Sequence, residues 1–274
     1  AVFDNDGTLW CEKPMYIQLA YILRTMAQKA TDDPALRTKQ PWQAAWERDF
    51  GWFGDAMTKH YQGDDADLHL LLGGVLALAQ DQPVEQVEAA AKAFIAQQRH
   101  PTLDRLYQEC IYPPMVELLR YLEAHGFTNY IVSGGGRDFM RGFVQELYGI
   151  PRRRTIGTTV AYHYVENDEG NHIAQHAELD LIDDGPNKPV QIWNVIGQRP
   201  ILAAGNSNGD IEMLKFTQGN DHATLNLLVY HDDDTREFAY DQGAERALEL
   251  AQARNWQVVS MRDDWTTVFP PASS

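Results

Sequence analysis

Cysteine is scarce in this sequence, and long apolar runs are absent. The 274 residues contain only Cys11 and Cys110, which excludes a disulfide framework and leaves open a single bridge between the two thiols. No stretch approaches the roughly 18 consecutive apolar residues of a transmembrane helix. We therefore expect a soluble protein without a membrane span.

Basic residues are also few relative to acidic ones. The chain has 23 Lys and Arg against 39 Asp and Glu, which gives a formal net charge of −16. Nucleic acids and anionic membranes attract basic surfaces, so neither is an expected partner. A small anionic ligand would need cations placed locally at its site. The acidic run at 232–234 is interpreted as a solvated loop.

The chain shows no leader with a charged start, an apolar stretch and a small-residue cleavage site. It begins at Ala1, without a methionine and inside an apolar run that is typical of a strand. A cytoplasmic location is therefore the favoured expectation. A periplasmic location is the alternative if a signal segment preceded Ala1.

Short apolar runs alternate with helical patterns over much of the chain. Strand alternating with helix predicts an α/β fold, a Rossmann-like parallel sheet with helices on both faces. The expected strands are 1–3, 130–132, 200–204, 225–230 and 256–260, and the expected helices are 114–125, 137–147, 189–196, 210–216 and 243–254.

The segment 13–112 interrupts this alternation, because it contains several helical patterns and no convincing strand. We expect a helical cap domain at 13–112, inserted into a core made of 1–12 and 113–274. Its expected helices are 15–29, 42–60, 67–79 and 83–98. Residues 155–176 alternate around a turn at 167–170, which predicts a hairpin beside the main sheet.

The first chemical motif is FDNDGTL at 3–9, in which Asp4 and Asp6 follow the first apolar run. In an extended chain this spacing places both carboxylates on one side. Open α/β sheets bind ligands at the carboxyl ends of their strands, so the pair should face a crevice. One carboxylate can attack phosphorus while the other transfers protons, with a divalent cation offsetting the negative charge. An ordinary turn after a strand is the competing interpretation.

Two further motifs offer phosphate ligands. IVSGGG at 131–136 places Ser133 and Gly134 between an expected strand and an expected helix, where backbone N–H groups can approach phosphate oxygens closely. Lys188, within DDGPNKP at 183–189, stands at the head of an expected helix and could neutralise both the nucleophile and the phosphate. A flexible connection and a solvated surface lysine are the respective alternatives.

The fourth motif is AGNSNGD at 204–210, again between an expected strand and an expected helix. Hard divalent cations prefer carboxylate, carbonyl and water oxygens. Asn206 and Asp210 could therefore complete a magnesium site that begins with Asp4 and the backbone carbonyl of Asp6. A turn in which Asp210 caps the following helix is the alternative.

Together and in this order, the four motifs resemble those of the haloacid dehalogenase superfamily. The helical insertion directly after the first motif makes the chain look like the phosphoserine-phosphatase-like branch, and the resemblance spans the whole chain. It implies a mobile cap that closes over the crevice and selects the substrate. It also implies that Asp4 is the nucleophile, Asp6 the general acid/base, Ser133 and Lys188 the phosphate ligands, and Asn206 with Asp210 the group on the metal side.

The chain departs from the family pattern at two positions. The family usually has an aspartate where Asn206 stands, so one negative charge is lost and magnesium affinity should be lower. The phosphoserine-specific enzymes place a glutamate nine residues after the nucleophile, where this chain has Lys13 with Glu12 one residue early. Phosphoserine is therefore not the expected substrate. Trp10 and Glu12, beside the first motif, are candidate substrate contacts.

The expected cap is rich in aromatic residues. Their helical spacing favours the core of a small bundle, and a surface that stacks on an apolar or cationic head group is the alternative. The residues concerned are Trp42, Trp46, Phe50, Trp52 and Phe53.

These observations predict a magnesium-dependent phosphatase that hydrolyses a small phosphorylated metabolite through an aspartyl-phosphate intermediate. Asp6 favours ester hydrolysis, because the dehalogenase branch of the superfamily lacks this second aspartate. A phosphomutase or phosphotransferase on the same core is one alternative. A non-catalytic binding protein that keeps the fold is the other, and Asn206 is its motivation.

Overall fold

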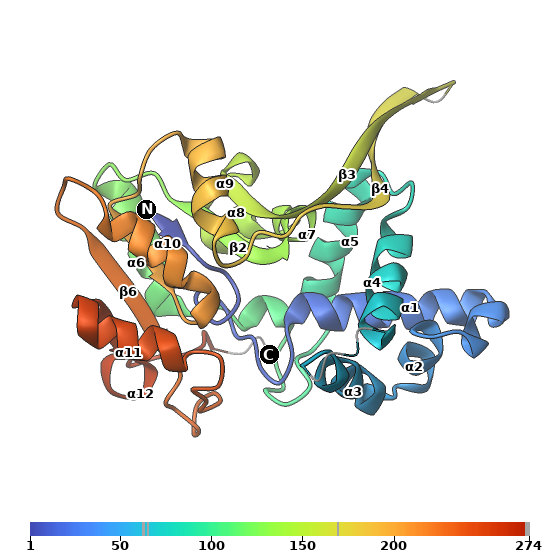
Figure 1. Cartoon of the computed structure of the whole chain (residues 1–274), viewed down its shortest axis with the longest axis horizontal. Coiled ribbons are helices and arrows are strands. Elements are labelled where there is room, and N and C mark those ends of the chain that lie inside the picture. The colour runs from blue at the N-terminus through green and yellow to red at the C-terminus, as the bar shows by residue number, and fades with distance from the viewer. Residues whose placement is uncertain (62–63, 65, 169, 272–274) are drawn as a thin grey trace. The chain divides into compact units, whose positions relative to one another are not determined.

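The computed structural model describes residues 1–61, 64, 66–168 and 170–271. The described strands form a seven-stranded sheet in the order β4-β3-β2-β1-β5-β6-β7 (Figure 1). The pairings from β3 across to β7 are parallel. The Rossmann-like α/β core expected from the sequence is confirmed. The strands are β1 (Val2–Phe3), β2 (Tyr130–Gly136), β3 (Thr155–Asn167), β4 (Gly170–Leu181), β5 (Leu202–Gly205), β6 (Leu225–Tyr230) and β7 (Gln257–Ser260).

The central strand β1 lies between β2 and β5. Val2 pairs with Tyr130 on one side and with Ala203 on the other. Central parallel strands are covered on both faces, which explains why they read as short continuous apolar runs. The three strands are parallel, so their carboxyl ends are adjacent. Residues that follow them in three distant parts of the sequence therefore meet at one edge.

Strand β2 is longer than the sequence predicted. It continues through the glycines to Gly136, with a register shift on β3 between Ser133 and Gly136. Ser133 pairs with Gly157, and Gly136 pairs with the next residue, Thr158, so β2 bulges by two residues. A Cβ at Gly157 would lie 2.7 Å from the carbonyl oxygen of Gly135, so the bulge requires a glycine opposite it.

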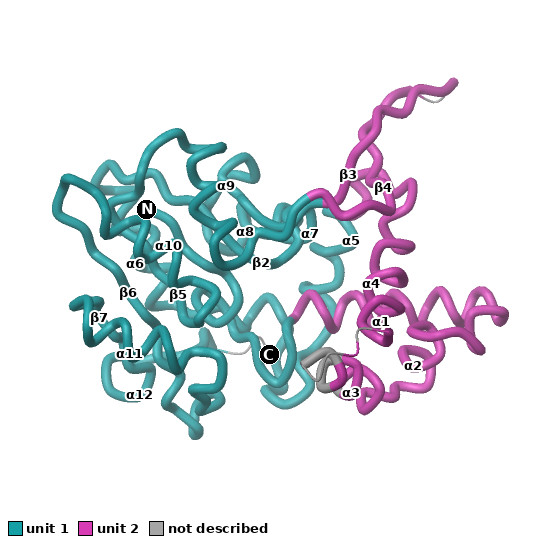
Figure 2. Tube along the Cα trace, in the orientation of Figure 1, with its two compact units in different colours: residues 1–16, 88–159, 181–274 teal, residues 17–87, 160–180 magenta. Residues whose placement is uncertain are grey.

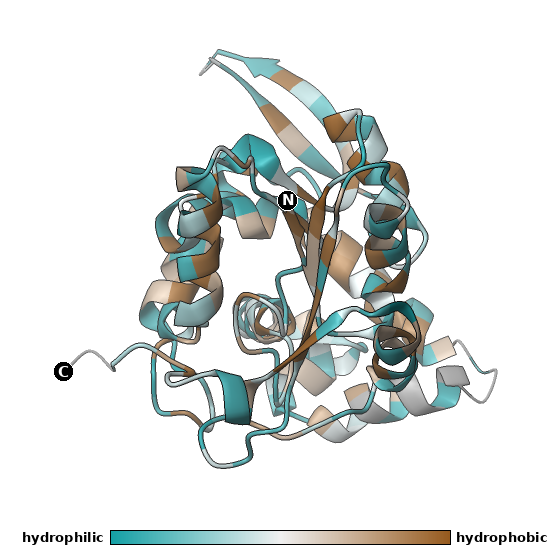
Figure 3. Ribbon diagram, turned by 90° about the vertical axis from the view of Figure 1, so that its left-hand side faces the viewer, coloured by the Kyte–Doolittle hydropathy of each residue, from teal (hydrophilic) through white to brown (hydrophobic). Residues whose placement is uncertain are grey.

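Helices flank the apolar strands on both sides (Figure 3). Buried residues of α9, α10 and α11, among them Ile192, Leu214 and Ala251, pack with Val132 and Leu228 of the sheet. Core helices are α6 (Pro113–Ala124), α7 (Arg137–Arg141), α8 (Val144–Tyr148), α9 (Asn187–Ile196), α10 (Ile211–Gln218), α11 (Glu245–Arg254) and α12 (Met261–Asp264), with 3-10 turns at Tyr107–Glu109, Arg152–Arg154 and Asn208–Asp210.

The helix expected at 137–147 is divided into α7 and α8. Gly142 ends the first of them. A Cβ at Gly142 would lie 2.4 Å from the carbonyl oxygen of Glu88, which belongs to α5 (Val84–Gln97). The break is therefore set by close packing against a helix distant in sequence, which local periodicity does not encode.

The chain divides into two compact units (Figure 2). The first comprises 1–16, 88–159 and 181–274, and the second comprises 17–87 and 160–180. These bounds differ from the expected insertion at 13–112: most of α5 groups with the first unit, and the outer part of the β3–β4 hairpin groups with the second. The hairpin is the edge of the sheet and not a separate element beside it. Residue 169 of its expected turn lies outside the described residues.

The second unit contains helices α1 (Ile17–Asp32), α2 (Trp42–Glu47), α3 (Phe50–Tyr61) and α4 (Ala66–Ala79), with a 3-10 turn at Pro34–Thr38. The helix expected at 42–60 is divided, because α2 ends at Arg48 in the left-handed conformation, φ 59°. Trp42 and Phe53 are buried, as a bundle core requires, whereas Trp46 and Phe50 are 41% and 55% exposed. The core interpretation therefore holds for only part of the aromatic set.

The described part of the chain contains neither a disulfide bridge nor a membrane-spanning helix. Cys11 and Cys110 are buried free thiols, so the single bridge left open by the sequence does not form. Among the described residues, no helix is long and apolar enough to cross a membrane.

Candidate active site

The first motif forms a tight loop at the carboxyl end of β1. The N–H of Asp4 donates to the carbonyl of Ala204 at 2.9 Å, which continues the pairing with β5. Gly7 has φ +73°, and its N–H donates to the carbonyl of Trp10 at 2.8 Å. A Cβ at Gly7 would lie 2.1 Å from the side-chain nitrogen of Asn206. The loop therefore requires glycine both for its backbone conformation and for the space beside it.

Lys188, in the first turn of α9, lies between two carboxylates. Its Nζ donates to Oδ1 of Asp4 at 2.9 Å and to Oδ1 of Asp210 at 2.6 Å. All three side chains are at least nine-tenths buried. The structure thus brings together three of the expected site residues from the ends of β1 and β5 and the start of α9.

Burial and charge shift the pKa values of this cluster in a consistent way. Burial and the neighbouring Asp210 raise the pKa of Asp4 well above its usual value, and Lys188 only partly opposes them. Burial alone would lower the pKa of Lys188, but Asp210 and Asp4 outweigh it and raise that pKa. Lys188 is therefore a permanent cation, and the raised pKa of Asp4 reflects carboxyl groups that outnumber the cations around it.

Asp6 is held by Trp10. The indole Nε1 donates to Oδ1 of Asp6 at 2.8 Å, and the ring stacks on Phe143 at 4.7 Å between centroids. Burial raises the pKa of Asp6 to about 6, against the opposing effect of this hydrogen bond. The sequence suggested that Trp10 touches a substrate, but its ring has no exposed surface. In this structure the polar contact of Trp10 is the hydrogen bond that orients Asp6, and its contact with a substrate stays a prediction.

Ser133 and Gly134 lie at the bulge of β2. Ser133 is 1% exposed, and its Oγ accepts the N–H of Gly135 at 3.1 Å. Gly134 is exposed, and its carbonyl accepts a hydrogen bond from the hydroxyl of Thr158 at 2.7 Å. The exposed part of this turn is therefore the backbone at Gly134, with the Ser133 hydroxyl behind it.

Asp210 closes the loop that follows β5. Its Oδ2 accepts the N–H groups of Asn206 and Ser207, both at 3.0 Å, while its Oδ1 accepts from Lys188. Both carboxylate oxygens are thus engaged by donors of the protein. Asp210 is the last residue of the 3-10 turn whose N-cap is Ser207, and its side chain caps no N–H of the following helix α10, so the alternative interpretation of this motif is not borne out. Asp210 instead holds Lys188 in place.

Asn206 lies among the first-motif residues. Its Oδ1 accepts from the hydroxyl of Thr8 at 3.0 Å, and its Nδ2 donates to Oε1 of Glu12 at 3.5 Å. The same Glu12 oxygen accepts from the hydroxyl of Tyr240 at 2.7 Å. Glu12 is 6% exposed. The carboxylate that the sequence offered as a substrate contact is therefore bonded within the protein, next to the amide that replaces the family's aspartate.

The donor set fits a hard divalent cation. Asp4 supplies a buried carboxylate, Asn206 an amide oxygen and Asp6 a backbone carbonyl, and such cations prefer oxygen ligands. A bound cation would oppose the burial and the neighbouring Asp210 that raise the pKa of Asp4, and would so favour its ionised form. No group of three or more His, Cys, Asp and Glu in the described part of the chain is arranged to hold a metal. A cation at this loop would therefore rely on neutral oxygens beside Asp4.

Comparison with known proteins agrees with this geometry. The family model of haloacid dehalogenase-like hydrolases matches residues 1–215, which include every site residue predicted from the sequence. The chain belongs to the haloacid dehalogenase-like hydrolase family. No curated protein matches the chain.

Solved structures of similar fold include proteins of unknown function. One from Bordetella pertussis Tohama I is 16% identical, with 94% of this chain and 96% of that one covered and a TM-score of 0.58. One from Anaerococcus prevotii DSM 20548 is 22% identical over 67% of this chain, which spans about half of that protein (51%), with a TM-score of 0.46. A phosphoserine phosphohydrolase-like protein from Francisella tularensis subsp. tularensis SCHU S4 is 18% identical, with 94% and 93% covered and a TM-score of 0.46. The likeness to the Bordetella protein supports the fold.

Sequence reasoning missed several buried polar residues around the site of this haloacid dehalogenase-like hydrolase. Asp183 is fully buried and precedes Lys188 by five residues. His231 follows β6 and contacts the carbonyl of Gly7, and Glu237 contacts His231. The position of His231 at the carboxyl end of a parallel strand was the available signal, because ligand sites of such sheets lie at that end.

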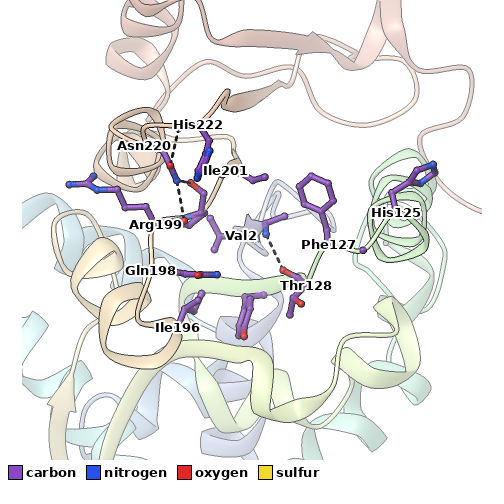
Figure 4. Close-up of a pocket in the computed structure, with 14 residues that line it drawn as sticks. Val2, His125, Phe127, Thr128, Ile196, Gln198, Arg199, Ile201, Asn220 and His222 are labelled. Carbon is purple, nitrogen blue, oxygen red and sulfur yellow. Dashed lines mark hydrogen bonds between the residues drawn. The ribbon is translucent and has the colours of Figure 1, made fainter.

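A cavity of about 510 Å³ lies elsewhere in the first unit (Figure 4). It is lined by Val2, Thr128, Ile201 and Asn220, among others, around the amino-terminal side of β1. None of the paired carboxylates lines it. We therefore place the candidate active site at the carboxyl end of β1 and not in this cavity.

Proposed function

We propose that this haloacid dehalogenase-like hydrolase is a phosphatase that hydrolyses a small phosphomonoester. The observation that carries the proposal is the buried Asp4–Lys188–Asp210 cluster with Asp6 two residues beyond Asp4. An attacking carboxylate, a fixed cation and a second carboxyl group with an adjusted pKa are the parts that stepwise phosphoryl transfer needs.

In the first step a carboxylate oxygen of Asp4 attacks phosphorus, and the bond between phosphorus and the ester oxygen breaks. Asp6, in its protonated form, gives its proton to the leaving alkoxide. Its pKa of about 6 keeps a usable protonated fraction near neutral pH. The product on the protein is an aspartyl phosphate on Asp4.

In the second step Asp6, now ionised, takes a proton from a water that attacks the same phosphorus. The bond between phosphorus and Asp4 breaks, which restores the Asp4 carboxylate and the protonated form of Asp6 and releases inorganic phosphate. Lys188 stays charged throughout and stabilises the negative charge that develops on the transferred group. Ser133 and the backbone at Gly134 are the proposed hydrogen-bond donors to its oxygens.

Magnesium is the proposed cofactor, held by Asp4, the backbone carbonyl of Asp6 and Asn206. When bound, it supplies positive charge that lets an anionic carboxylate approach an anionic phosphate. Asp210 is proposed to support the site by holding Lys188 and the loop at Asn206, because both of its oxygens already accept hydrogen bonds. The helical segment 13–112 is the proposed cap that selects the substrate.

Phosphate release from a panel of phosphomonoesters tests the proposal. We expect release with magnesium, none with EDTA, and a loss of at least about 10³-fold in kcat for Asp4→Asn and for Asp6→Asn. Trp10→Phe is the matched control for Asp6→Asn, because it deletes one hydrogen bond to Asp6 and leaves the carboxyl group. Its loss of turnover should be much smaller than that of Asp6→Asn, because the carboxyl group that transfers the proton remains.

Two outcomes would redirect the assignment. Substantial turnover in Asp4→Asn would remove Asp4 as the nucleophile. If the wild-type protein binds magnesium and releases phosphate from no ester, then a phosphomutase or a binding protein becomes the better reading. Transfer of phosphate between two sugar positions would identify the first of these.

A further inference from the structure

His231 contacts the first-motif loop, and both of its ring nitrogens lie within hydrogen-bond distance of an oxygen atom. Its Nε2 is 2.8 Å from the carbonyl oxygen of Gly7, and its Nδ1 is 3.0 Å from Oε2 of Glu237. Both His231 and Glu237 are buried, with 3% and 7% exposed. A carbonyl oxygen can only accept a hydrogen bond, so Nε2 must carry a proton.

The proton count at Nδ1 depends on whether Glu237 is ionised. Burial alone would raise the pKa of Glu237, but the hydrogen bonds that it accepts, among them those from Tyr112 and from the N–H of Phe238, hold that pKa below its usual value. Oε1 accepts from the hydroxyl of Tyr112, and Oε2 also accepts the N–H of Phe238 at 3.1 Å. Surrounded by donors, the carboxyl group is a carboxylate. It can only accept, so Nδ1 must carry a proton as well.

A second buried histidine shows the contrasting case. Nδ1 of His100 accepts the N–H groups of Thr102 and Leu103 at 3.3 and 3.2 Å, so this nitrogen carries no proton. Its Nε2 lies 2.6 Å from the carbonyl of Lys13 and donates to it. Burial lowers the pKa of His100, in keeping with a neutral ring. The two rings therefore differ in protonation by the chemistry of their partners.

The Gly7 carbonyl is a sensitive point at which to place a charged donor. Gly7 is the residue after Asp6, and the N–H of Gly7 is already fixed by Trp10. With both polar groups of Gly7 bonded, neither peptide plane beside it can rotate freely. The His231 ring also stacks on Tyr240 at 4.4 Å, whose hydroxyl bonds Glu12.

We infer that His231 is a buried imidazolium, paired with Glu237, that acts as a positioning residue for the Asp6–Gly7 turn. Its charged N–H holds the Gly7 carbonyl more strongly than a neutral donor could. It also adds a second positive charge, after Lys188, beneath a loop crowded with carboxylates. The effect on turnover rests on the proposed phosphatase function, whereas the protonation state does not.

The protonation state can be measured directly on the wild-type protein. Histidine-selective ¹⁵N NMR at pH 7 should show two protonated ring nitrogens for His231 and one for His100, with His231→Gln and His100→Gln assigning the signals. A neutral His231 ring with one unprotonated nitrogen would overturn the inference. This result is independent of whether the protein turns over any ester.

The positioning role is tested by kinetics of His231→Gln and Glu237→Gln. His231→Gln keeps one neutral donor for Gly7 and should lower kcat about 10–100-fold with little change in KM. Glu237→Gln removes the counter-charge at nearly constant volume, so the His231 ring of this variant should carry one proton in place of two. Histidine-selective ¹⁵N NMR at pH 7 should then show one unprotonated ring nitrogen for His231 in the variant and none in the wild type.

The other titratable groups that face His231 are Tyr112, Tyr240 and, beyond Glu237, Cys11. Tyr112→Phe is the matched control, because it removes a hydrogen bond from Glu237 and leaves both charges. It should leave both ring nitrogens of His231 protonated, unlike Glu237→Gln. If His231→Gln and Glu237→Gln lower stability alike and neither lowers kcat, His231 is structural and the positioning role is excluded. Should the wild type release no phosphate, the NMR result still decides the charged state.

Discussion

Asp183 is fully buried, yet among the described residues neither of its carboxylate oxygens has a hydrogen-bond partner. Burial raises its pKa to about 7, with Lys188 opposing the shift and Asp184 adding to it. A carboxyl group whose pKa is raised by folding is easier to ionise in the unfolded chain. The folded state therefore loses stability as pH rises from about 4 to about 7.

The substitution Asp183→Asn should remove this pH-dependent penalty. The free energy of unfolding should rise relative to the wild type by about 4 kcal/mol at pH 8 and by about 1–2 kcal/mol at pH 5, where the acid is protonated in the folded state and ionised only in the unfolded chain. Urea denaturation at the two pH values measures the difference. An equal change at both values would mean that Asp183 has an ordinary pKa.

Site residues that belong to a recognisable sequence motif could be predicted from the sequence, and site residues outside any motif could not. Asp4 and Lys188 were recognised from short patterns, and their contact across 184 positions follows from the parallel strands. His231 and Glu237 stand in no pattern, and the acidic run beside them hid a buried group: Asp233 is 3% exposed and bonded to Arg236. Which side chains face inward at the end of a strand depends on packing that a single sequence does not contain.

Helix α4 carries two adjacent glycines that differ in their surroundings. A Cβ at Gly73 would meet nothing within 4 Å, whereas a Cβ at Gly74 would lie 2.5 Å from Cγ of Pro41. Alanine is favoured over glycine in a helix interior by about 1 kcal/mol. Local propensity therefore favours both substitutions, and packing opposes one of them.

We expect Gly73→Ala to raise the free energy of unfolding by about 0.5–1 kcal/mol and Gly74→Ala to lower it by about 1–3 kcal/mol. The two variants are matched controls for each other, because they share helix, residue type and neighbours in sequence. Thermal denaturation followed by circular dichroism measures both. A stabilised Gly74→Ala variant would show that α4 does not pack closely on Pro41.

The same competition explains which elements could be predicted from the sequence. Strand β6 and helix α9 coincide with their apolar patterns to within two residues, because their buried faces set those patterns. The expected helices at 42–60 and 137–147 each broke in two, at Arg48 and at Gly142. The apolar residues keep helical spacing on both sides of each break, so the spacing alone did not reveal the breaks.

The whole molecule carries a net charge of −16, and the proposed substrate is an anion. Like charges repel at long range, and the Debye length falls from about 30 Å at 0.01 M salt to about 10 Å at 0.1 M. Screening should therefore help a phosphomonoester to approach. It should hinder a magnesium ion, which the same field attracts.

Two measurements over one sodium chloride series should consequently change in opposite directions. With magnesium saturating, kcat/KM for a phosphomonoester should rise a few-fold between about 0.01 and 0.1 M salt, while magnesium affinity measured by calorimetry should fall. The kcat at saturating ester is the control and should stay constant, because it does not depend on encounter. If kcat/KM falls with salt instead, cations local to the site, with Lys188 first among them, outweigh the charge of the whole molecule along the path of approach.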